Sequence, residues 1–578
     1  MNKIYFLLIA ILLLGCSGKR GTSEHQGGTI RMCLETEPMT YLTYEISDYY
    51  SATVFGQVME GLVSIDPSTL KIKNQIASSC TVSDDGTVYT FHIREDVYFH
   101  PHETFKNDNE RKLTPADIVA TFELICSPTK SNTESVAYGH LLKGTVKGVQ
   151  EFYEKKTKKI EGIKVKGHTV EITLNEKDDN FLYKLAQIQL AIHAKEIIDA
   201  NKVTDVIGTG PFIFDNYQSG EVPQILLSRN EDYYEADEQG DQLPYLDSIK
   251  FVIQNRKLDQ LDMFENKQID MILALPTSKI TKMVEGRLSD FNSTPPSLML
   301  NKNALLHTHF YSFNMEEPRF QNIKVRQAFN YAVDRERIGR EVLKNQYDEL
   351  GYYGIVPPIS QTFRGYDFKA VRDAGYTYNP EKARKLLAEA GYPNGKDFGT
   401  VNLRFNIGDI NSAVADEFAQ QIFQVLGINV NIDGSDFEQL TNDAINGKGD
   451  MFKSSWIADY PNPENFLNNF QSGNIPDKEQ NKTGLNFSKY NNPLFDNLLD
   501  EAKKESNVGK KMKLYTKAET ELMKNPPIIP LWYSGDLQIV HSYVRNLHFN
   551  SLSLFNFKKV YLKPWTAEEY QKEIAQKK

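Results

Sequence analysis

A helix followed closely by a strand, in the second half of the chain, restricts the fold more than any other feature. Apolar residues recur at helical spacing over 379–390, where an asparagine caps the start, proline takes the first position and a glycine follows the end. A second helix is predicted over 412–426, and Gly427 ends it. Residues 428–432 then alternate with a period of two, as in a strand. Such helix-to-strand units predict an α/β fold.

The first half of the chain shows the same mixture. Residues 88–94 alternate like a half-buried strand. Thr114 is a good helix cap, with Pro115 at the first helical position and Asp117 at the third. At 578 residues the chain is long enough for several domain-sized units.

Composition excludes several classes of protein. The 76 acidic side chains outnumber the 66 basic ones, which argues against a broad nucleic-acid surface. Aromatic residues make up 11% of the chain, too many for a disordered protein. A mean hydropathy of −0.47 excludes a protein built from many membrane spans.

The N-terminus predicts export. One lysine precedes an apolar run over 4–14, which as a helix reaches about 16 Å, short of the ~30 Å hydrocarbon core. We predict a signal peptide over 1–15. The Leu-Leu-Gly-Cys sequence ending at Cys16 resembles a bacterial lipobox, in which that cysteine is acylated; an unlipidated signal peptide is the alternative. Residues 16–27 are then a lipidated polar tether, which holds the protein in the cell envelope, in the periplasm or on the outer face of the cytoplasmic membrane.

Three cysteines remain after Cys16. Cys33, Cys80 and Cys126 permit at most one disulfide, and each lies in an apolar or strand-like context. We expect unpaired, buried thiols.

Catalytic signatures are missing from the sequence. It contains no His-Glu-x-x-His, no Gly-x-Ser-x-Gly and no Walker motif, so we predict no catalytic residues, no cofactor and no metal site. The pairs His100 with His102 and His307 with His309 could each approach one metal ion, but no carboxylate or cysteine follows at a recognisable spacing.

Short segments along the chain carry a resemblance to one family. They are Met59–Val63, Ser83–Phe99, Thr114–Val119, Ile207–Phe212, Ser228–Asn230, Leu243–Asp247, Phe313–Met315, Val325–Ala328, Ala332–Arg335, Asn379–Gly395 and Trp456–Glu464. No single segment is specific. In this order and spacing, from about residue 28 to 561, they resemble the family 5 solute-binding proteins of ABC importers, the dipeptide, oligopeptide and nickel receptor group.

The resemblance implies a bilobed α/β fold, a clamshell of the type II periplasmic-binding-protein kind with an extra small domain on the first lobe. The implied boundaries are 28–75, 207–309 and 533–578 for domain I, 76–206 for domain II and 310–532 for domain III. Two crossings, near 310–313 and 531–534, would form the hinge. Ligand bound between the lobes would shift an open-to-closed equilibrium.

The resemblance also implies a site. A receptor for many peptides reads main-chain groups and charged termini, and a buried α-ammonium needs a carboxylate. In oligopeptide-binding members the Asp of a Trp-x-Ala-Asp motif supplies it. The implied ligand-binding residues are Asp459 for the ammonium, Ser455, Trp456 and Ile457 for the peptide backbone, and Tyr311 and Tyr533 as cleft aromatics.

Alternative roles for these residues stay open. Asp459 could instead cap a turn before Pro461, and Trp456 could be a core residue. Asn462-Pro463 stands where the family more usually has Asp-Pro.

We therefore expect a monomeric lipoprotein that captures short peptides and delivers them to the membrane permease and ATPase subunits of an ABC importer, without catalysis and without nucleic acid. In the same architecture the ligand could be a nickel chelate, haem or another small solute, and the receptor could sense peptides without transport. From another class, a surface lipoprotein metallohydrolase would use His100 and His102.

Overall fold

The structure is a computed structural model that describes residues 24–128, 133–273, 275, 280–476 and 484–577. The predicted signal peptide, Cys16 and the first part of the tether lie outside the described residues. Within the described part, no helix combines the length and the apolar character needed to cross a membrane.

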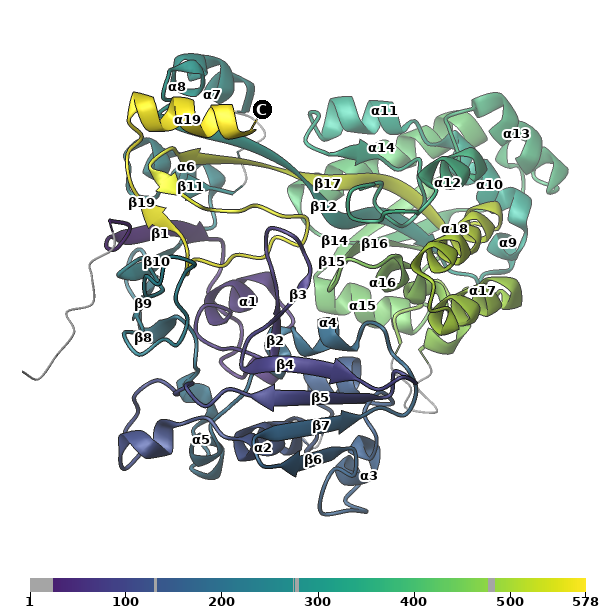
Figure 1. Cartoon of the computed structure of the whole chain (residues 1–578). Coiled ribbons are helices and arrows are strands. Elements are labelled where there is room, and N and C mark those ends of the chain that lie inside the picture. Colours follow the sequence, from purple (N-terminus) through teal and green to yellow (C-terminus); the bar gives the residue numbers. More distant parts are fainter. Residues whose placement is uncertain (1–23, 129–132, 274, 276–279, 477–483, 578) are drawn as a thin grey trace, which may run out of the picture.

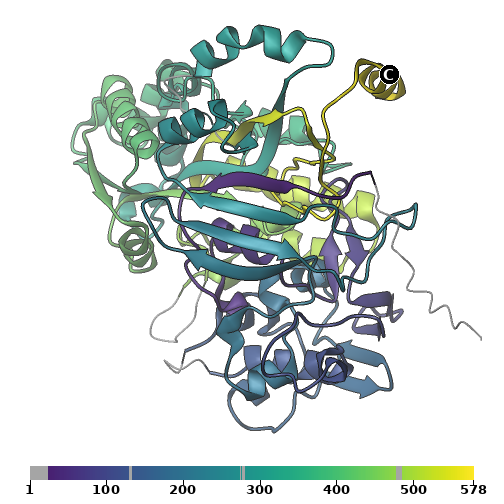
Figure 2. The same ribbon diagram turned by 90° about the vertical axis from the view of Figure 1, so that its left-hand side faces the viewer.

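Four strands that lie far apart in the sequence build the first sheet. They are β1 (Thr29–Leu34), β8 (Phe212–Gln218), β9 (Gln224–Arg229) and β10 (Ser248–Ile253), in the order β1-β10-β9-β8. Figure 2 shows the purple strand β1 beside the teal strands of this sheet. β1 runs parallel to β10, and α1 (Tyr49–Phe55) contributes Val54 and Phe55 to the shared core. Chain segments that precede residue 77 and follow residue 173 thus form one unit.

The second sheet belongs to the smaller unit at the bottom of Figure 1. Its strands β4 (Ala77–Val82), β5 (Val88–Ile93), β6 (Ile163–Lys166) and β7 (Thr169–Thr173) pair antiparallel in the order β4-β5-β7-β6. Helix α2 (Pro115–Ile125) packs Ile118 and Phe122 into the same core as Phe91 of β5. It begins after the predicted cap Thr114, whose main-chain N–H and hydroxyl both donate to the carboxylate of Asp117.

The third sheet has seven strands. Its order is β11 (Met271–Ile272), β17 (Ile528–His541), β12 (Leu298–Phe313), β16 (Met451–Ile457), β14 (Val401–Asn406) and β15 (Val430–Ser435), with β13 (Glu349–Leu350) beside β17.

The helix-to-strand units predicted for this lobe are confirmed. Helix α13 (Pro380–Glu389) is capped by the Asn379 side chain, and α14 (Asp409–Leu426) ends at Gly427 with φ 71°. α14 begins three residues earlier than predicted. β15 begins two residues later, because pairing with β14 starts only at Val401 and Val430 while Ile428 is still a core residue.

Strands β12 and β17 run through both lobes (Figure 1). Their first-lobe halves pair from Leu298 with His541 to Ala304 with Gly535, beside β11. The register then shifts, and pairing resumes from Thr308 with Tyr533 in the lobe that contains β16. The chain therefore crosses between the lobes on a pair of continuous, hydrogen-bonded strands.

Further helices and short strands complete the described structure. The helices are α3 (Val149–Tyr153), α4 (Phe181–Leu185), α5 (Lys195–Asp199), α6 (Lys257–Glu265), α7 (Ile280–Gly286), α8 (Leu288–Asn292), α9 (Pro318–Gln321), α10 (Ile323–Ala332), α11 (Arg335–Arg337), α12 (Phe368–Ala374), α15 (Phe437–Ile445), α16 (Pro463–Leu467), α17 (Pro493–Lys504), α18 (Val508–Lys524) and α19 (Ala567–Lys577). The remaining strands are β2 (Val63–Ile65), β3 (Ile72–Asn74), β18 (Val544–Arg545) and β19 (Tyr561–Leu562).

The buried carboxylate of Glu60 links two of the matched sequence segments, its own and the one that contains Thr209. Glu60 accepts hydrogen bonds from Tyr233 Oη at 2.8 Å, Thr209 Oγ1 at 2.9 Å and Gln75 Nε2 at 2.8 Å. Burial raises the pKa of this carboxyl to about 7. The motif residues of the first lobe thus serve its architecture.

The three described cysteines are unpaired, as expected. Cys33 and Cys126 are buried, whereas Cys80 is only half-buried on the outer strand β4. Burial raises the pKa of the Cys33 thiol to about 12, which keeps it protonated.

The buried Glu519 of α18 predicts how the stability of the second lobe depends on pH. Its carboxyl accepts from Val356 N at 2.8 Å and from Ile355 N and Tyr366 Oη, and burial raises its pKa from 4.5 to about 8. Between these values the folded state holds a proton that the unfolded chain has lost. The free energy of unfolding therefore falls as pH rises through this window, by up to about 1.4 kcal/mol per pH unit.

Glu519→Gln removes this titration and keeps an amide that can bond the same partners. Urea unfolding at pH 5 and pH 8 should show a smaller loss of stability in the variant than in the natural protein. Parallel losses in both proteins would contradict the assignment.

Candidate functional site

Strand β16 has an unpaired edge beside the small unit. On one side it pairs with β12 from His307–Ile457 to Phe313–Met451. On the other side β14 pairs with it only at Met451 and Phe452. From Lys453 to Ile457, no strand among the described residues pairs with this second side, which leaves a short sheet edge open.

The direction of the main-chain groups on this edge follows from the register. Ala458 N donates to Leu306 O at 2.8 Å, so Ala458 bonds toward β12. Hydrogen-bonded pairs alternate along antiparallel strands, so Trp456 also turns its main chain toward β12. Ser455 and Ile457 turn their main-chain N–H and C=O groups the other way, toward the open side of β16. Both residues are exposed, Ile457 to 59%.

One asparagine positions the residues that follow this edge. Asn465 of α16 accepts from Trp456 Nε1 at 2.8 Å and from Asp459 N at 3.2 Å. Its Nδ2 donates to Asp459 Oδ2 at 3.0 Å. The buried amide therefore fixes both the indole and the carboxylate, and Trp456 is half-buried rather than a full core residue.

Asp459 lies at the surface of the protein. It is exposed to solvent, yet the surrounding protein desolvates its carboxyl enough to raise its pKa above the ordinary value. The hydrogen bond from Asn465 and the charge of His140 in the small unit act in the opposite direction. No ion pair to Asp459 occurs among the described residues, so its charge is available to a cation.

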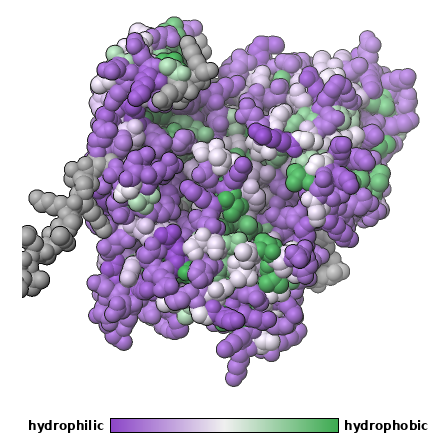
Figure 3. Space-filling model, in the orientation of Figure 1, coloured by the Kyte–Doolittle hydropathy of each residue, from purple (hydrophilic) through white to green (hydrophobic). Residues whose placement is uncertain are grey.

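The small unit touches the second lobe beside this carboxylate. Gln187 Nε2 donates to Asp459 O at 2.9 Å, and Asn462 Nδ2 donates to Asn180 Oδ1 at 2.9 Å. In Figure 3 the face shown is largely hydrophilic, with apolar surface near the middle, about where β3 and α4 lie in Figure 1, and in further patches over the lobe at the right. Asp459 therefore lies where the units meet.

Tyr311 and Tyr533 are both buried. Tyr311 packs against Phe418 of α14 with ring centroids 4.8 Å apart. Tyr533 Oη donates to Gly354 O at 2.8 Å and accepts from Tyr353 N at 3.1 Å. Neither ring presents surface to the open edge in this structure, so a role in lining a cleft stays a prediction.

The two histidine pairs are engaged in other contacts. His100 bonds Gly210 O at 2.9 Å, whereas His102 lies 3.2 Å from Asp205. Ser534 Oγ bridges His307 Nδ1 at 3.0 Å and His309 Nε2 at 2.9 Å. Among the described residues, no group of three or more His, Cys, Asp or Glu side chains could hold a metal ion.

Sequence reasoning missed Asn465 and Gln187. Asn465 is adjacent to the matched Trp456–Glu464 segment, but its role depends on α16 folding back over β16. Gln187 comes from another unit altogether, and no local pattern marks it.

Comparisons with known proteins give one consistent result. The family model of the bacterial extracellular solute-binding proteins, family 5 Middle, matches residues 71–477. Di/tripeptide-binding protein 1 of Pseudomonas aeruginosa is 28% identical over 537 residues, covering 91% of each chain. Heme-binding protein A of Haemophilus influenzae is 29% identical over 548 residues, covering 91% of this chain and 92% of the relative.

Solved structures agree with this match. The DppA protein of Helicobacter pylori in complex with the peptide STSA has a TM-score of 0.74 at 23% identity, covering 93% of this chain and 99% of that one. The Escherichia coli murein tripeptide binding protein MppA has a TM-score of 0.72 at 19% identity, covering 94% and 100%. The predicted α/β fold of the periplasmic binding proteins is confirmed.

Asn465→Leu tests the positioning of the site. The substitution leaves Trp456 Nε1 and Asp459 N without their acceptor, which should cost about 1–3 kcal/mol in the free energy of unfolding. Urea unfolding measures the change. Asn429→Leu, at an exposed asparagine of the same lobe, should stay within about 0.5 kcal/mol. Equal effects of the two substitutions would refute the positioning role.

Proposed function

Because this chain belongs to family 5 of the bacterial extracellular solute-binding proteins, we propose that it captures short peptides for an ABC importer. Members of this family bind solutes, which agrees with the missing catalytic signatures. The observation that carries the peptide assignment is the open edge of β16 next to the exposed carboxylate of Asp459.

The open edge presents main-chain N–H and C=O groups, with which the backbone of any peptide can form hydrogen bonds. Ser455 and Ile457 direct N–H and C=O groups to a side without a partner strand in the described structure, so an extended peptide can pair there as an added strand. Such pairing uses main chain only and accepts many sequences. The main-chain groups of Trp456 face β12, so this residue contacts the peptide through its side chain instead.

Asp459 then takes the α-ammonium of the peptide. It follows Ile457 by two residues, at the end of the edge, and desolvation raises its pKa. A desolvated carboxylate gains most from a cation that arrives with the ligand, because the pair restores the lost interaction with water.

Haem remains the second candidate, since heme-binding protein A is as similar as the peptide receptor. The open edge favours the peptide, because haem has no main-chain amides to pair with it. A nickel chelate has less support, since the described histidine pairs bond to carbonyl, hydroxyl or carboxylate groups of the protein.

The wider setting is proposed on the same basis. The protein works outside the cytoplasm, anchored through Cys16, and releases peptide to the permease and ATPase subunits of an importer. We assign the strand pair β12 and β17 as the hinge between domain I and domain III, with 76–206 as domain II.

Asp459→Asn tests the assignment of the ammonium site. Removing the charge should weaken peptide affinity by about 10²-fold or more, as expected when a desolvated charge loses its partner. Calorimetry with short peptides measures the change, and Glu501→Gln, at an exposed carboxylate of α17 in the same lobe, should leave the affinity unchanged. Undiminished binding by Asp459→Asn, with an intact fold, would remove Asp459 from this role.

A further inference from the structure

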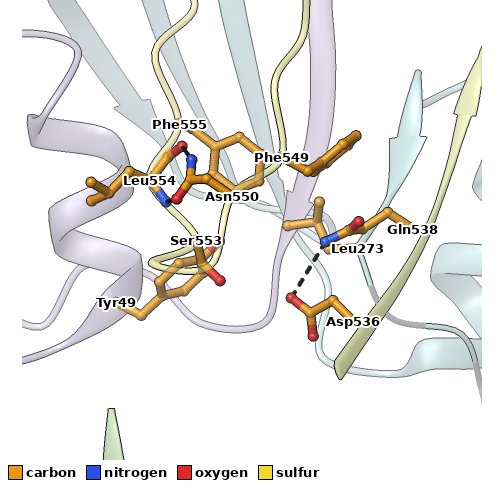
Figure 4. A pocket seen from close by; sticks show the side chains of 9 residues that line it. All are labelled: Tyr49, Leu273, Asp536, Gln538, Phe549, Asn550, Ser553, Leu554 and Phe555. Carbon is orange, nitrogen blue, oxygen red and sulfur yellow. Dashed lines mark hydrogen bonds between the residues drawn. The ribbon is translucent and has the colours of Figure 1, made fainter. Parts of the chain in front are cut away.

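A hollow beside β17 is too small to hold a further ligand. It lies between α1, β17 and the loop at 549–555, and Figure 4 shows the side chains that line it. Its free volume is about 20 Å³, room for roughly one water molecule. A different part of the first lobe, helix α19 with residues 563–566 before it, presents an apolar surface to solvent.

Helix α19 carries an apolar face that no core of the protein covers. Figure 2 shows the helix apart from the rest of the ribbon, at the upper right. Ala567, Tyr570 and Ile574 recur at spacings of three and four residues, so they share one face. None of the residues from 567 to 575 is buried, and Ile574 is 36% exposed. Since a helix of a globular protein normally buries its apolar face, this face lacks its partner in the described structure.

Trp565 extends the apolar face of α19. Its ring contacts the ring of Tyr570, with centroids 5.4 Å apart, and the guanidinium of Arg545 lies over the indole. Both rings are only half-buried, and neither belongs to a hydrophobic core of the described structure. Trp and Tyr side chains favour the boundary between water and lipid, where the ring contacts apolar groups and its polar end stays hydrated.

The N-terminal segment is held next to α19. Gly28 N donates to Asp247 Oδ2 at 2.8 Å, which fixes this segment on the first lobe. Lys563 Nζ lies 3.2 Å from the carboxylate of Glu24 and 3.0 Å from that of Glu569, in the first turn of α19. A single lysine therefore joins the start of α19 to Glu24.

Few residues separate Glu24 from the predicted lipid anchor. Residues 17–23 are all that lie between Cys16 and Glu24. Even a fully extended chain over this interval spans at most roughly 28 Å. Helix α19, with 11 residues, is about 17 Å long. A bilayer that holds the acyl chains of Cys16 is therefore within reach of α19.

We propose that α19 lies on the surface of the bilayer that holds Cys16, with Trp565, Tyr570 and Ile574 at the boundary between headgroups and acyl chains. The inference rests on the lipid anchor of the proposed function. An apolar face of this size binds a membrane weakly by itself, but the anchor holds it there at an effective concentration of about millimolar. The contact fixes which side of the first lobe faces the membrane.

Tryptophan fluorescence of the mature protein tests this contact. The protein is extracted from cells with detergent, and mass spectrometry checks the acylation of Cys16. It is then reconstituted into vesicles of phosphatidylethanolamine and phosphatidylglycerol, with or without bromine on the acyl chains. Bromine quenches a tryptophan only at close range. Trp532 is buried and Trp456 is half-buried in the second lobe, so Trp565 is the tryptophan that bromine should quench.

Brominated vesicles should lower the emission of the natural protein, and Trp565→Phe should remove that loss. Ile574→Gln should remove it as well, because a polar side chain on the apolar face opposes insertion. Glu568→Gln, at an exposed position of the same helix, should keep the quenching. All three variants should keep the urea midpoint of the natural protein, which shows that they fold.

Other results would overturn the inference in distinguishable ways. Equal emission of the natural protein in both kinds of vesicle would refute the membrane contact and leave a protein surface as the partner of α19. Quenching that survives Ile574→Gln would exclude the apolar face as the contact. A mature protein without acyl chains would refute the anchor and this inference with it. Calorimetry on the same samples measures peptide binding separately, so its absence alone would contradict the proposed peptide capture and not the membrane contact.

Discussion

The rest of the structure depends on the pairing of β12 with β17. These two strands cross together from the first lobe to the second, and they stay paired on both sides of the register shift between Ala304 and Thr308. Backbone hydrogen bonds make the crossing a defined element rather than a loose linker. The pairing also determines the geometry of the candidate site. The register of β16 against β12 turns the main-chain groups of Ser455 and Ile457 toward the open edge of β16.

Two carboxylates illustrate how one kind of group serves different purposes. Glu60 is buried among three donors, one of them Thr209 of another matched segment, and stabilises the first lobe. The Asp459 carboxylate bonds the side chain of one asparagine and is exposed to solvent, so it can pair with a cation from outside the protein. The number of donors around each carboxylate, rather than burial alone, separates the structural group from the proposed binding group.

Local sequence patterns predicted the structural features that depend on residues close together in the sequence. The caps of α2 and α13, the glycine at the end of α14 and the alternation of β5 depend on neighbours a few residues away, and each was predictable. The family motifs then supplied the bilobed architecture, which no local pattern contains. Gln187 and Asn465 were not predictable, because each acts through a partner that only the fold brings close.

The central claim is that the open edge of β16 and Asp459 capture short peptides. Native mass spectrometry of the protein purified from cells without refolding tests it most directly, because a tightly held ligand survives purification. The account predicts a ladder of extra masses that resolves into short peptides when the protein is denatured. A single haem-sized or metal-sized adduct on an otherwise bare protein would contradict it.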